Sequence, residues 1–216
     1  MYYKQFSKAL IFNRGFFIAV IFFFNVIGTT NAQNFKSLNK FEKRWFVFHP
    51  RAAFKTKRAS SIAINQSIEL AKQGKVDNVI YGGTQDVARH VFWMNELYFS
   101  VGYRKALKIG LLHERDNKRR FNNAVNKNSI KNDSVLTEMD IRNNQKALSL
   151  IKLNKKKFTS SEVLNDISTG TYLILKRDVN GNSLNVADEI ISMEELKKWN
   201  NKSCLVPSNY KYNEKR

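Results

Sequence analysis

The chain has 216 residues, of which 37 are lysine or arginine, 18 are aspartate or glutamate and one is cysteine. Hydrophobic residues make up 43% and charged residues 25%, which is typical of a globular protein and not of a disordered or fibrous one. The single cysteine excludes an intramolecular disulfide framework, a thiolate zinc finger and a CxxC redox site, and neither a Walker A loop nor a GxGxxG motif is present.

Residues 1–32 have the pattern of a secretory signal peptide. A short apolar run extends from Gly15 to Ile27, and small residues then occupy the −3 and −1 positions of Thr30-Asn31-Ala32, which predicts cleavage before Gln33. The positive residues before the run are Lys4, Lys8 and Arg14. We expect export to the periplasm or out of the cell. The run is shorter than the roughly 18–20 residues of a membrane span, so we expect no integral membrane segment in the mature chain, an uncleaved anchor being the alternative.

After cleavage the chain would keep 34 basic residues against 18 acidic ones. This excess indicates either an anionic partner, such as an envelope component, a substrate or a nucleic acid, or a compositional bias that also favours solubility. The second interpretation is favoured because the chain is also rich in Asn, Ile, Phe and Tyr. The charge is scattered as well, apart from short runs such as Lys118-Arg119-Arg120 and Lys155-Lys156-Lys157.

Helical patterns follow along the mature chain, where apolar residues recur with helical spacing. Residues 33–56 contain Pro50, which disfavours helical geometry at His49, so we expect an extended segment there. Thr84 is a candidate N-cap, and residues 120–134 are polar enough for a loop. The predicted helices span residues 57–73, 84–101, 103–119, 135–151, 160–167 and 192–199.

The C-terminal part changes character. Residues 171–175 are apolar and β-branched enough for a strand, and Asn180-Gly181 is typical of a two-residue hairpin turn leading to a second strand near 183–187. The stretch from Asp178 to Glu189 also resembles a calcium-binding loop. Its sixth position is Ser183 where such a loop requires glycine, which favours the hairpin.

These patterns predict a mainly α fold: a compact bundle of about four to five helices with a small C-terminal β-hairpin. We expect a signal peptide over residues 1–32, a helical domain over 33–158, and a C-terminal hairpin and short helix over 159–216 packed on the same domain.

Residues capable of chemistry gather at three places on the predicted helices. The first place holds Asp86 and His90, which share a helix face because they are four residues apart. A carboxylate so placed can orient an imidazole and raise its basicity. Arg89 lies beside them and can pair with Asp86 or with an anionic ligand, and Trp93 continues the face.

The second place is His113-Glu114, and the third is Asp140 with Asn143 and Asn144. Each place alone favours a structural role, because a lone helical histidine is usually a packed residue and helical Asp–Arg pairs are usually surface salt bridges. No strong metal signature is present, since HExxH is absent.

The combined pattern D-x-x-R-H-x-x-W, then H-E, then M-D-x-x-N-N resembles an uncharacterised family of bacterial exported proteins known only as a domain of unknown function. That family usually has Asp-Ala-Phe-Arg-His-Ala-x-Trp, and the resemblance covers about residues 41–150. It departs at Val87-Ala88 and at Gln145-Lys146, where small or aromatic residues are usual. The matching positions, besides an upstream Trp45-x-x-x-His49-Pro50, are Asp86, Arg89, His90, Trp93, Gly102, Ala106, His113, Glu114, Met139, Asp140, Asn143 and Asn144. Related domains end large toxin-like secreted proteins, so the resemblance implies a hydrolytic or toxic activity without an established reaction.

Two functions remain open. The first is an exported, hydrolase-like domain in which His90, Asp86, His113 and Glu114 are catalytic. A divalent metal such as zinc would be held by His90, His113 and Asp140, and the substrate by Arg89, Trp93, Asn143 and Asn144. The second is a non-catalytic binding or structural module, in which the polar cluster is a buried hydrogen-bond network and the basic surface binds envelope polyanions. The first is favoured by a small margin, because buried polar groups are costly unless they are satisfied or used.

Overall fold

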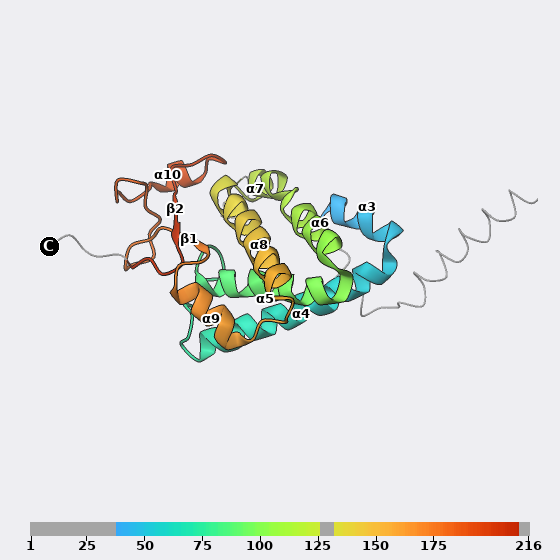
Figure 1. Ribbon diagram of the computed structural model, residues 1–216. Helices are drawn as coiled ribbons and strands as arrows, with labels where there is room; N and C mark the ends of the chain where they lie inside the picture. The colour runs from blue at the N-terminus through green and yellow to red at the C-terminus, as the bar shows by residue number, and fades with distance from the viewer. Residues whose placement is uncertain (1–37, 126–131, 212–216) are drawn as a thin grey trace, which may run out of the picture. The chain divides into compact units, whose positions relative to one another are not determined.

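A computed structural model describes residues 38–125 and 132–211 (Figure 1). The predicted signal peptide and its cleavage before Gln33 lie outside the described residues. The chain divides into two units, Met1–Asn39 and Lys40–Arg216, and the second unit holds the described helices and strands. Within the described ranges, no helix combines the length and the apolar character that a membrane crossing requires.

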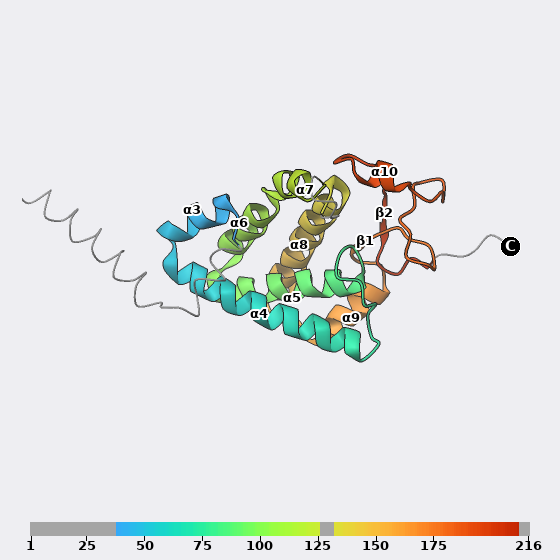
Figure 2. The same cartoon turned by 180° about the vertical axis from the view of Figure 1, so that it is seen from behind.

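The second unit is mainly helical, with a small two-stranded antiparallel sheet near the C-terminus, which confirms the predicted fold class (Figures 1 and 2). In chain order its elements are α3 (Lys40–Phe48), α4 (Pro50–Lys72), α5 (Thr84–Val101), α6 (Tyr103–Glu114), α7 (Asn117–Val125), α8 (Ser134–Asn154), α9 (Ser160–Ser168), β1 (Leu173–Leu175), α10 (Met193–Leu196) and β2 (Leu205–Pro207).

Helix α5 is the centre of the unit. It packs against α4, α6, α8 and α9, and most of its side chains are buried, as expected for a helix covered on several sides. The face of α4 that is buried carries small side chains, among them Ala52, Ala59 and Ala63, which allow close packing with α5. Figure 2 shows α4 running beside α5 for much of its length, with α6 and α8 beyond.

The extended segment predicted over residues 33–56 is wrong for residues 40–48, which form α3. The proline restricts only one residue. His49 has φ −135° and ψ 58°, outside helical geometry, and Pro50 then begins α4 at a position where a missing N–H costs nothing. Helix α4 therefore starts seven residues before the predicted helix 57–73.

The predicted helix 103–119 is two helices, α6 and α7, separated at Arg115 and Asp116. Asp116 directly precedes α7, and its carbonyl accepts the N–H of Arg120 over 3.0 Å, the first hydrogen bond of the new helix. Its carboxylate pairs with the guanidinium of Arg119. Helix α7 also occupies the first residues of the predicted loop 120–134, of which residues 126–131 lie outside the described ranges.

The sheet pairs different segments from those predicted. Strand β1 pairs with β2, Ile174 lying opposite Val206, and not with residues 183–187. The chain does turn at Asn180-Gly181, but over three residues (179–181) and not the predicted two, because Asp178 N–H donates to Asn182 O over 3.0 Å and Gly181 N–H donates to Asp178 O over 3.1 Å. Beyond the turn, Ser183 forms an isolated antiparallel bridge with Arg177 and Leu184 N–H donates to Lys176 O, so the predicted second strand begins. It does not continue, because the Asn185 carboxamide oxygen accepts the N–H groups of Ala187 and Glu189 and folds the chain back.

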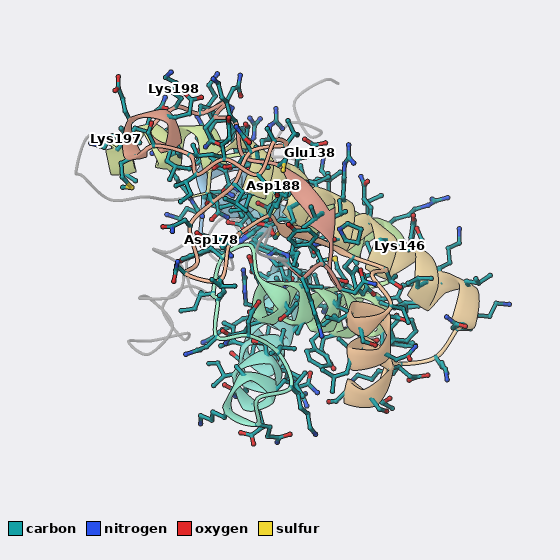
Figure 3. The ribbon with its side chains drawn as sticks, turned by 90° about the vertical axis from the view of Figure 1, so that its left-hand side faces the viewer. Glu138, Lys146, Asp178, Asp188, Lys197 and Lys198 are labelled. Carbon is teal, nitrogen blue, oxygen red and sulfur yellow. The ribbon has the colours of Figure 1, made fainter. Side chains whose placement is uncertain are left out.

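Charged side chains cover the outer surface of this end of the molecule. Figure 3 shows Glu138 and Lys146 projecting from α8, and Lys197 and Lys198 projecting from the segment that follows α10. Buried polar side chains occur in several elements, and α5 and α8 together hold seven of them: Gln85, Asp86, His90, Asn95, Asp140, Asn143 and Asn144.

Candidate functional site

The start of α5 is held by a neighbouring loop. Gly83 is the N-cap, and the predicted cap Thr84 is the first helical residue. The Asp77 carboxylate instead accepts the N–H groups of Thr84 (2.8 Å) and Gln85 (3.1 Å). A carboxylate at a helix N-terminus satisfies orphan donors and complements the helix dipole. The loop before α5 is thereby fixed against the helix.

Gly82 positions the first polar residue of the site. Its N–H donates to Oδ2 of Asp86 over 2.7 Å, and its carbonyl accepts the N–H of Leu175 in β1 over 2.8 Å. Its φ is +76°, and a Cβ there would lie 2.6 Å from Cδ2 of Leu136. Only glycine fits this backbone conformation and this space.

His90 faces four polar side chains from α5 and α8. Its Nδ1 lies 3.0 Å from Oδ1 of Asn144, so Nδ1–H donates there and Nε2 carries the lone pair. Nε2 accepts from Nη2 of Arg89 over 3.1 Å. The same nitrogen lies 3.3 Å from Oδ1 of Asp140 and 3.6 Å from Oδ1 of Asp86.

Burial governs the protonation of these groups. It lowers the pKa of His90 well below its usual value, and the Arg89 charge adds to this effect. It raises the pKa of Asp140 well above the usual range, helped by the nearby carboxylates of Asp86 and Glu114. It also raises the pKa of Asp86, against the opposing influence of Arg89. The site thus holds a neutral imidazole beside carboxyl groups that favour a proton or a cation.

Asp140 has an oxygen without a hydrogen bond. Its side chain is 1% exposed, and among the described residues Oδ1 has no hydrogen-bond partner, while Oδ2 accepts from Asn132 over 3.4 Å. The lone pair of His90 Nε2 and this oxygen are both acceptors. A proton or a metal ion between them would satisfy both.

The spacing of the donor atoms suits a small divalent cation. One atom each from Asp86, His90 and Asp140 lies within 4.8 Å of the others. Two ligands bound at about 2.1 Å to a tetrahedral zinc ion are about 3.4 Å apart, close to the separations of 3.3 and 3.6 Å around His90 Nε2. The group contains His90 and Asp140 of the predicted metal set, with Asp86 where His113 was expected.

Arg89 lies against the same atoms. Its Nη2 donates to Oδ1 of Asp86 as well as to His90. The negative charge of Asp86 raises the pKa of Arg89, although burial acts in the opposite direction. The guanidinium therefore lies where a metal ion would bind, and the two cations would compete. The Arg89 side chain is 28% exposed, which leaves it room to turn outward.

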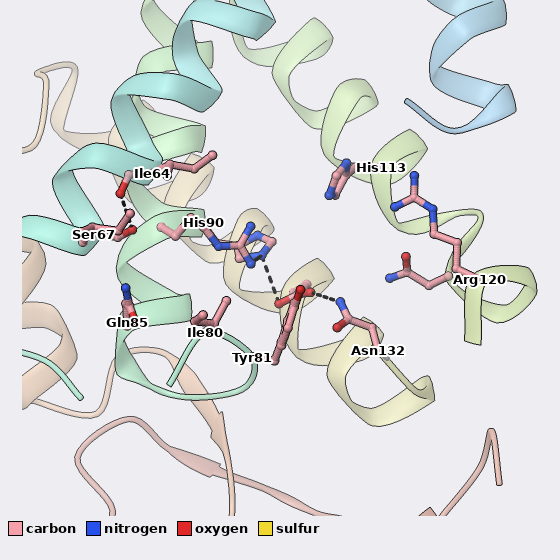
Figure 4. A pocket seen from close by; sticks show the side chains of 13 residues that line it. Ile64, Ser67, Ile80, Tyr81, Gln85, His90, His113, Arg120 and Asn132 are labelled. Carbon is pink, nitrogen blue, oxygen red and sulfur yellow. Dashed lines mark hydrogen bonds and ion pairs between the residues drawn. The ribbon is translucent and has the colours of Figure 1, made fainter. Parts of the chain in front are cut away.

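A cavity of about 410 Å³ opens beside this cluster (Figure 4). It brings together residues from α4, the loop before α5, α5, α6, α7 and the start of α8. The lining residues are Ile64, Ser67, Ile68, Ile80, Tyr81, Gln85, Arg89, His90, His113, Asn117, Arg120, Asn132 and Asp140.

His113 lines the cavity from α6, on the side opposite Ile64 in Figure 4. Its Nδ1 donates to Oε1 of Glu42 in α3 over 2.9 Å. Burial opposes protonation, but this hydrogen bond and the charges of Glu114 and Glu42 outweigh it and raise the pKa of His113. Trp93 contacts both histidines edge to face, with ring centroids 6.3 Å from His90 and 5.1 Å from His113.

Other predicted site residues lie behind the cavity or elsewhere. Trp93 is buried between the histidines and does not line the cavity. Glu114 is buried, accepts from Asn117 over 2.6 Å and has a raised pKa because of its burial. Asn143 holds strand β1, exchanging two hydrogen bonds of 2.9 Å with the backbone of Leu173. His49 stacks on Trp45 and is not part of the cavity.

Sequence reasoning missed several lining or supporting residues. Glu42 was missed because its segment was expected to be extended, yet helical spacing places it one turn from the buried Phe46. Gln85 stands next to Asp86 in the sequence and could have been included. Arg120 and Asn132 come from the predicted loop 120–134, and no local pattern brings them to the site.

Comparison with known proteins identifies the family of this chain but does not indicate an activity. Residues 43–171 match a domain of unknown function (DUF6973). Neither the curated proteins nor the solved structures gave a match. The matched residues include α4 to α9 and every residue that lines the cavity. Because the match spans more than half of the chain, this protein belongs to the DUF6973 family, a domain of unknown function.

Proposed function

We propose that this domain is a hydrolase that uses a divalent cation bound by Asp86, His90 and Asp140. One observation carries the proposal. The unpartnered Oδ1 of buried Asp140 lies 3.3 Å from the Nε2 lone pair of a neutral His90, at the edge of a cavity. A zinc-like ion at that position would lower the pKa of a bound water and provide a hydroxide nucleophile at neutral pH.

The opposite side of the cavity supplies a proton donor. Glu42 holds Nδ1 of His113, and the pKa of His113 is raised, which favours the imidazolium form. A protonated imidazole that lines the cavity can give its proton to a leaving group. Asn144, which holds Nδ1 of His90, would act as the positioning residue for the metal-binding nitrogen.

Arg89 would change its role when the cation binds. Two positive charges cannot share Oδ1 of Asp86 and Nε2 of His90, so the guanidinium would leave these atoms and turn into the cavity. There it could bind an anionic group of the substrate with a bidentate hydrogen bond.

The position of Arg89 also favours a second candidate, the non-catalytic module. In that case the guanidinium itself neutralises Asp86, and the polar cluster fixes the register of α5 against α8. The two candidates differ in whether the protein binds a stoichiometric metal ion.

Elemental analysis of the purified protein after incubation with zinc and dialysis tests the proposal. We expect about one equivalent of zinc in the wild type, since a three-residue donor set leaves one position for water, and none in Asp140→Asn. Glu138→Gln is the matched control, because Glu138 is an exposed carboxylate on the same helix, paired with Arg142. It should retain zinc as the wild type does.

Loss of zinc in Asp140→Asn would not reflect unfolding. The folded protein holds the Asp140 proton more tightly than the unfolded chain does, so ionisation of this carboxyl costs stability as the pH rises above the usual carboxyl range. The amide avoids that cost. We therefore expect the metal-free variant to be at least as stable as the metal-free wild type in denaturant unfolding.

Activity is tested with 4-nitrophenyl phosphate, bis(4-nitrophenyl) phosphate and 4-nitrophenyl acetate in the presence of zinc. We expect turnover of at least one substrate, reduced about a hundredfold or more in Asp140→Asn and unchanged in Glu138→Gln. Absence of zinc from the wild type, together with absence of turnover, would overturn the proposal and support the structural network.

A further inference from the structure

The outer surface of the α3–α4 junction carries large apolar side chains that are exposed to solvent. The exposed fraction is 75% for Phe48, 73% for Phe54 and 44% for Val47. The helical repeat places Phe54 on the side of α4 away from Ala52 and Ala59, which are buried. Figures 1 and 2 show the junction at the end of the helical unit that lies away from β1 and β2. Exposed apolar side chains that gather in one place indicate an interaction surface.

Positively charged side chains share this surface. Arg51 lies three residues before Phe54 and Arg58 four residues after it, so both occupy the same face of α4 as Phe54. Arg44 lies three residues before Val47, on the same face of α3. In the part of the chain that the structure describes, none of these three guanidinium groups pairs with a carboxylate. Their charges are therefore not neutralised by an ion pair there.

Acidic residues are scarce in this part of the chain. Glu42 and Glu69 are the only acidic residues before Asp77. Glu42 is buried, and its carboxylate accepts a hydrogen bond from His113. Glu69 lies about three turns of α4 beyond Arg58. The outer surface of the junction therefore has an excess of positive charge.

The helices that pack against the junction do not offset this charge. Helix α6 packs on α3, and its only acidic residue, Glu114, is buried. The C-terminal end of α5 reaches the start of α4, where the ammonium group of Lys55 donates to the carbonyl of Ser100 over 2.7 Å. The acidic residue of α5 one turn earlier is Glu96, which pairs with Lys157. The excess thus belongs to the folded structure and does not reflect composition alone.

We infer that this surface docks onto a membrane that contains anionic lipids. It consists of Arg44, Val47, Phe48, Arg51, Phe54 and Arg58, and we call it the docking surface. Its apolar side chains would enter the boundary between headgroups and acyl chains, and its guanidinium groups would bind lipid phosphates. None of its residues lines the cavity, so the inference does not depend on the proposed reaction.

The exposure of the two phenylalanines favours a bilayer over a nucleic acid. Proteins that bind single strands combine a basic groove with aromatic side chains on which the bases stack. Phe48 and Phe54 are each more than 70% exposed, so they project from the surface instead of lining a groove. Apolar side chains that project between arginines on a helix are typical of segments that lie in a membrane interface.

Quenching of tryptophan fluorescence by brominated lipids tests whether the docking surface meets the bilayer. The probe is a vesicle of brominated phosphatidylglycerol and phosphatidylcholine, added to the Phe54→Trp variant of the whole chain. The three tryptophans of the wild type give the background. We expect quenching in Phe54→Trp to exceed this background about twofold or more, because the side chain would enter the acyl-chain boundary. Quenching equal to the background would overturn the inference.

The control for position is Val186→Trp. Val186 is 82% exposed and lies in the C-terminal segment, outside the docking surface. This variant should show no quenching beyond the background. Equal excess quenching in Val186→Trp and Phe54→Trp would show that the protein adsorbs without a preferred face and would overturn the inference.

Two double variants separate the charges from the apolar side chains, with vesicle affinity measured by co-sedimentation. Arg51→Gln, Arg58→Gln should lower the affinity about tenfold or more, because each basic residue near an anionic membrane contributes about fivefold. Phe48→Ser, Phe54→Ser should also lower it about tenfold. Unchanged affinity in both double variants would overturn the inference.

The matched control for charge is Lys146→Gln, Lys197→Gln, which removes two exposed lysines from other elements (Figure 3). Its vesicle affinity should stay within about twofold of the wild type, because these lysines lie outside the docking surface. A loss equal to that in Arg51→Gln, Arg58→Gln would show a general effect of net charge and would overturn the inference.

A fluorescent single-stranded oligonucleotide tests the alternative partner. If Arg51→Gln, Arg58→Gln loses oligonucleotide binding but keeps its vesicle affinity, the surface binds nucleic acid and the inference is wrong. Asp140→Asn separates docking from the proposed function. If that variant lacks zinc but binds vesicles as the wild type does, docking stands without the metal site. If the wild type binds zinc but Phe54→Trp shows no excess quenching, the metal site stands and the inference is wrong.

Discussion

His90 and His113 line the same cavity, yet their surroundings shift their protonation in opposite directions. His90 is fully enclosed, and burial lowers its pKa well below the usual value. The His113 side chain is 35% exposed, and Glu42 helps to raise its pKa. One side therefore presents an imidazole that burial keeps neutral, which can bind a metal or accept a proton, and the other an imidazole whose surroundings favour the protonated form, which can donate one. Titratable groups whose pKa values are driven apart in this way are typical of acid–base pairs in enzymes.

The two histidines should differ most in their contribution to stability. His90→Ala removes the partner of Asn144 and leaves several buried polar groups around an empty space, so we expect a loss of about 3 kcal/mol. His113→Ala removes a hydrogen bond from the buried Glu42 carboxylate, but His113 itself is partly exposed, so we expect a smaller loss of about 1–2 kcal/mol. Denaturant unfolding of the two metal-free variants measures both values. Equal losses would contradict the distinction between the two regions.

The arginines Arg89 and Arg120 test the same difference between the His90 side and the His113 side of the cavity. Arg89→Met removes the cation that lies on Asp86 and His90, so we expect zinc affinity to rise about tenfold. Arg120→Met removes a cation from the His113 side and should change zinc affinity less, because Nε of Arg120 lies 3.9 Å from the Asp116 carboxylate, which is not a candidate ligand. Competition with a chromogenic zinc chelator measures both. A fall in affinity in Arg89→Met would mean that the arginine supports the metal ligands instead of competing with the ion.

The pH dependence of stability tests the His113 side by itself. The pKa of His113 is raised in the folded protein, so its stabilisation is fully present below the unfolded value of about 6.5 and is lost as the pH rises through the folded pKa. We expect the difference in unfolding free energy between wild type and Glu42→Gln to shrink as the pH rises above about 6.5 and through the folded pKa of His113. Glu69→Gln, a change on α4 outside the cavity, is the control. A difference that is constant with pH would exclude a protonated His113 as the source of the effect.

The sequence was informative where structure is local. The bounds of α5, from Thr84 to Val101, follow from flanking glycines and apolar spacing, and the helical repeat places Asp86 and His90 on one face. Contacts between residues far apart in the chain could not be predicted from the sequence. Nothing in residues 173–175 indicates a partner at 205–207, and nothing near His113 points to Glu42 in another helix.

Asn143 and Asn144 show what a sequence motif by itself cannot predict. The two side chains are identical, and both were predicted to bind the substrate. Consecutive residues of a helix project in different directions around its axis. Asn143 therefore binds the backbone of Leu173, while Asn144 binds the ring of His90. The angle of α8 against α5 and β1 decides which residue does which, and that angle depends on the packing of the whole unit.

The hydrogen bonds of the Gly82 backbone connect the C-terminal segment to the candidate site. The family match ends at residue 171, but the N–H of Leu175, beyond that limit, donates to the carbonyl of Gly82, whose own N–H holds Asp86. Arg177 donates to the carbonyl of Tyr81 in the same way. Displacement of β1 would therefore move the peptide that fixes the Asp86 carboxylate. Leu175 and Arg177, which follow the matched range, thus help to hold the loop that positions Asp86. Their removal would loosen the site without deleting any residue of the cavity.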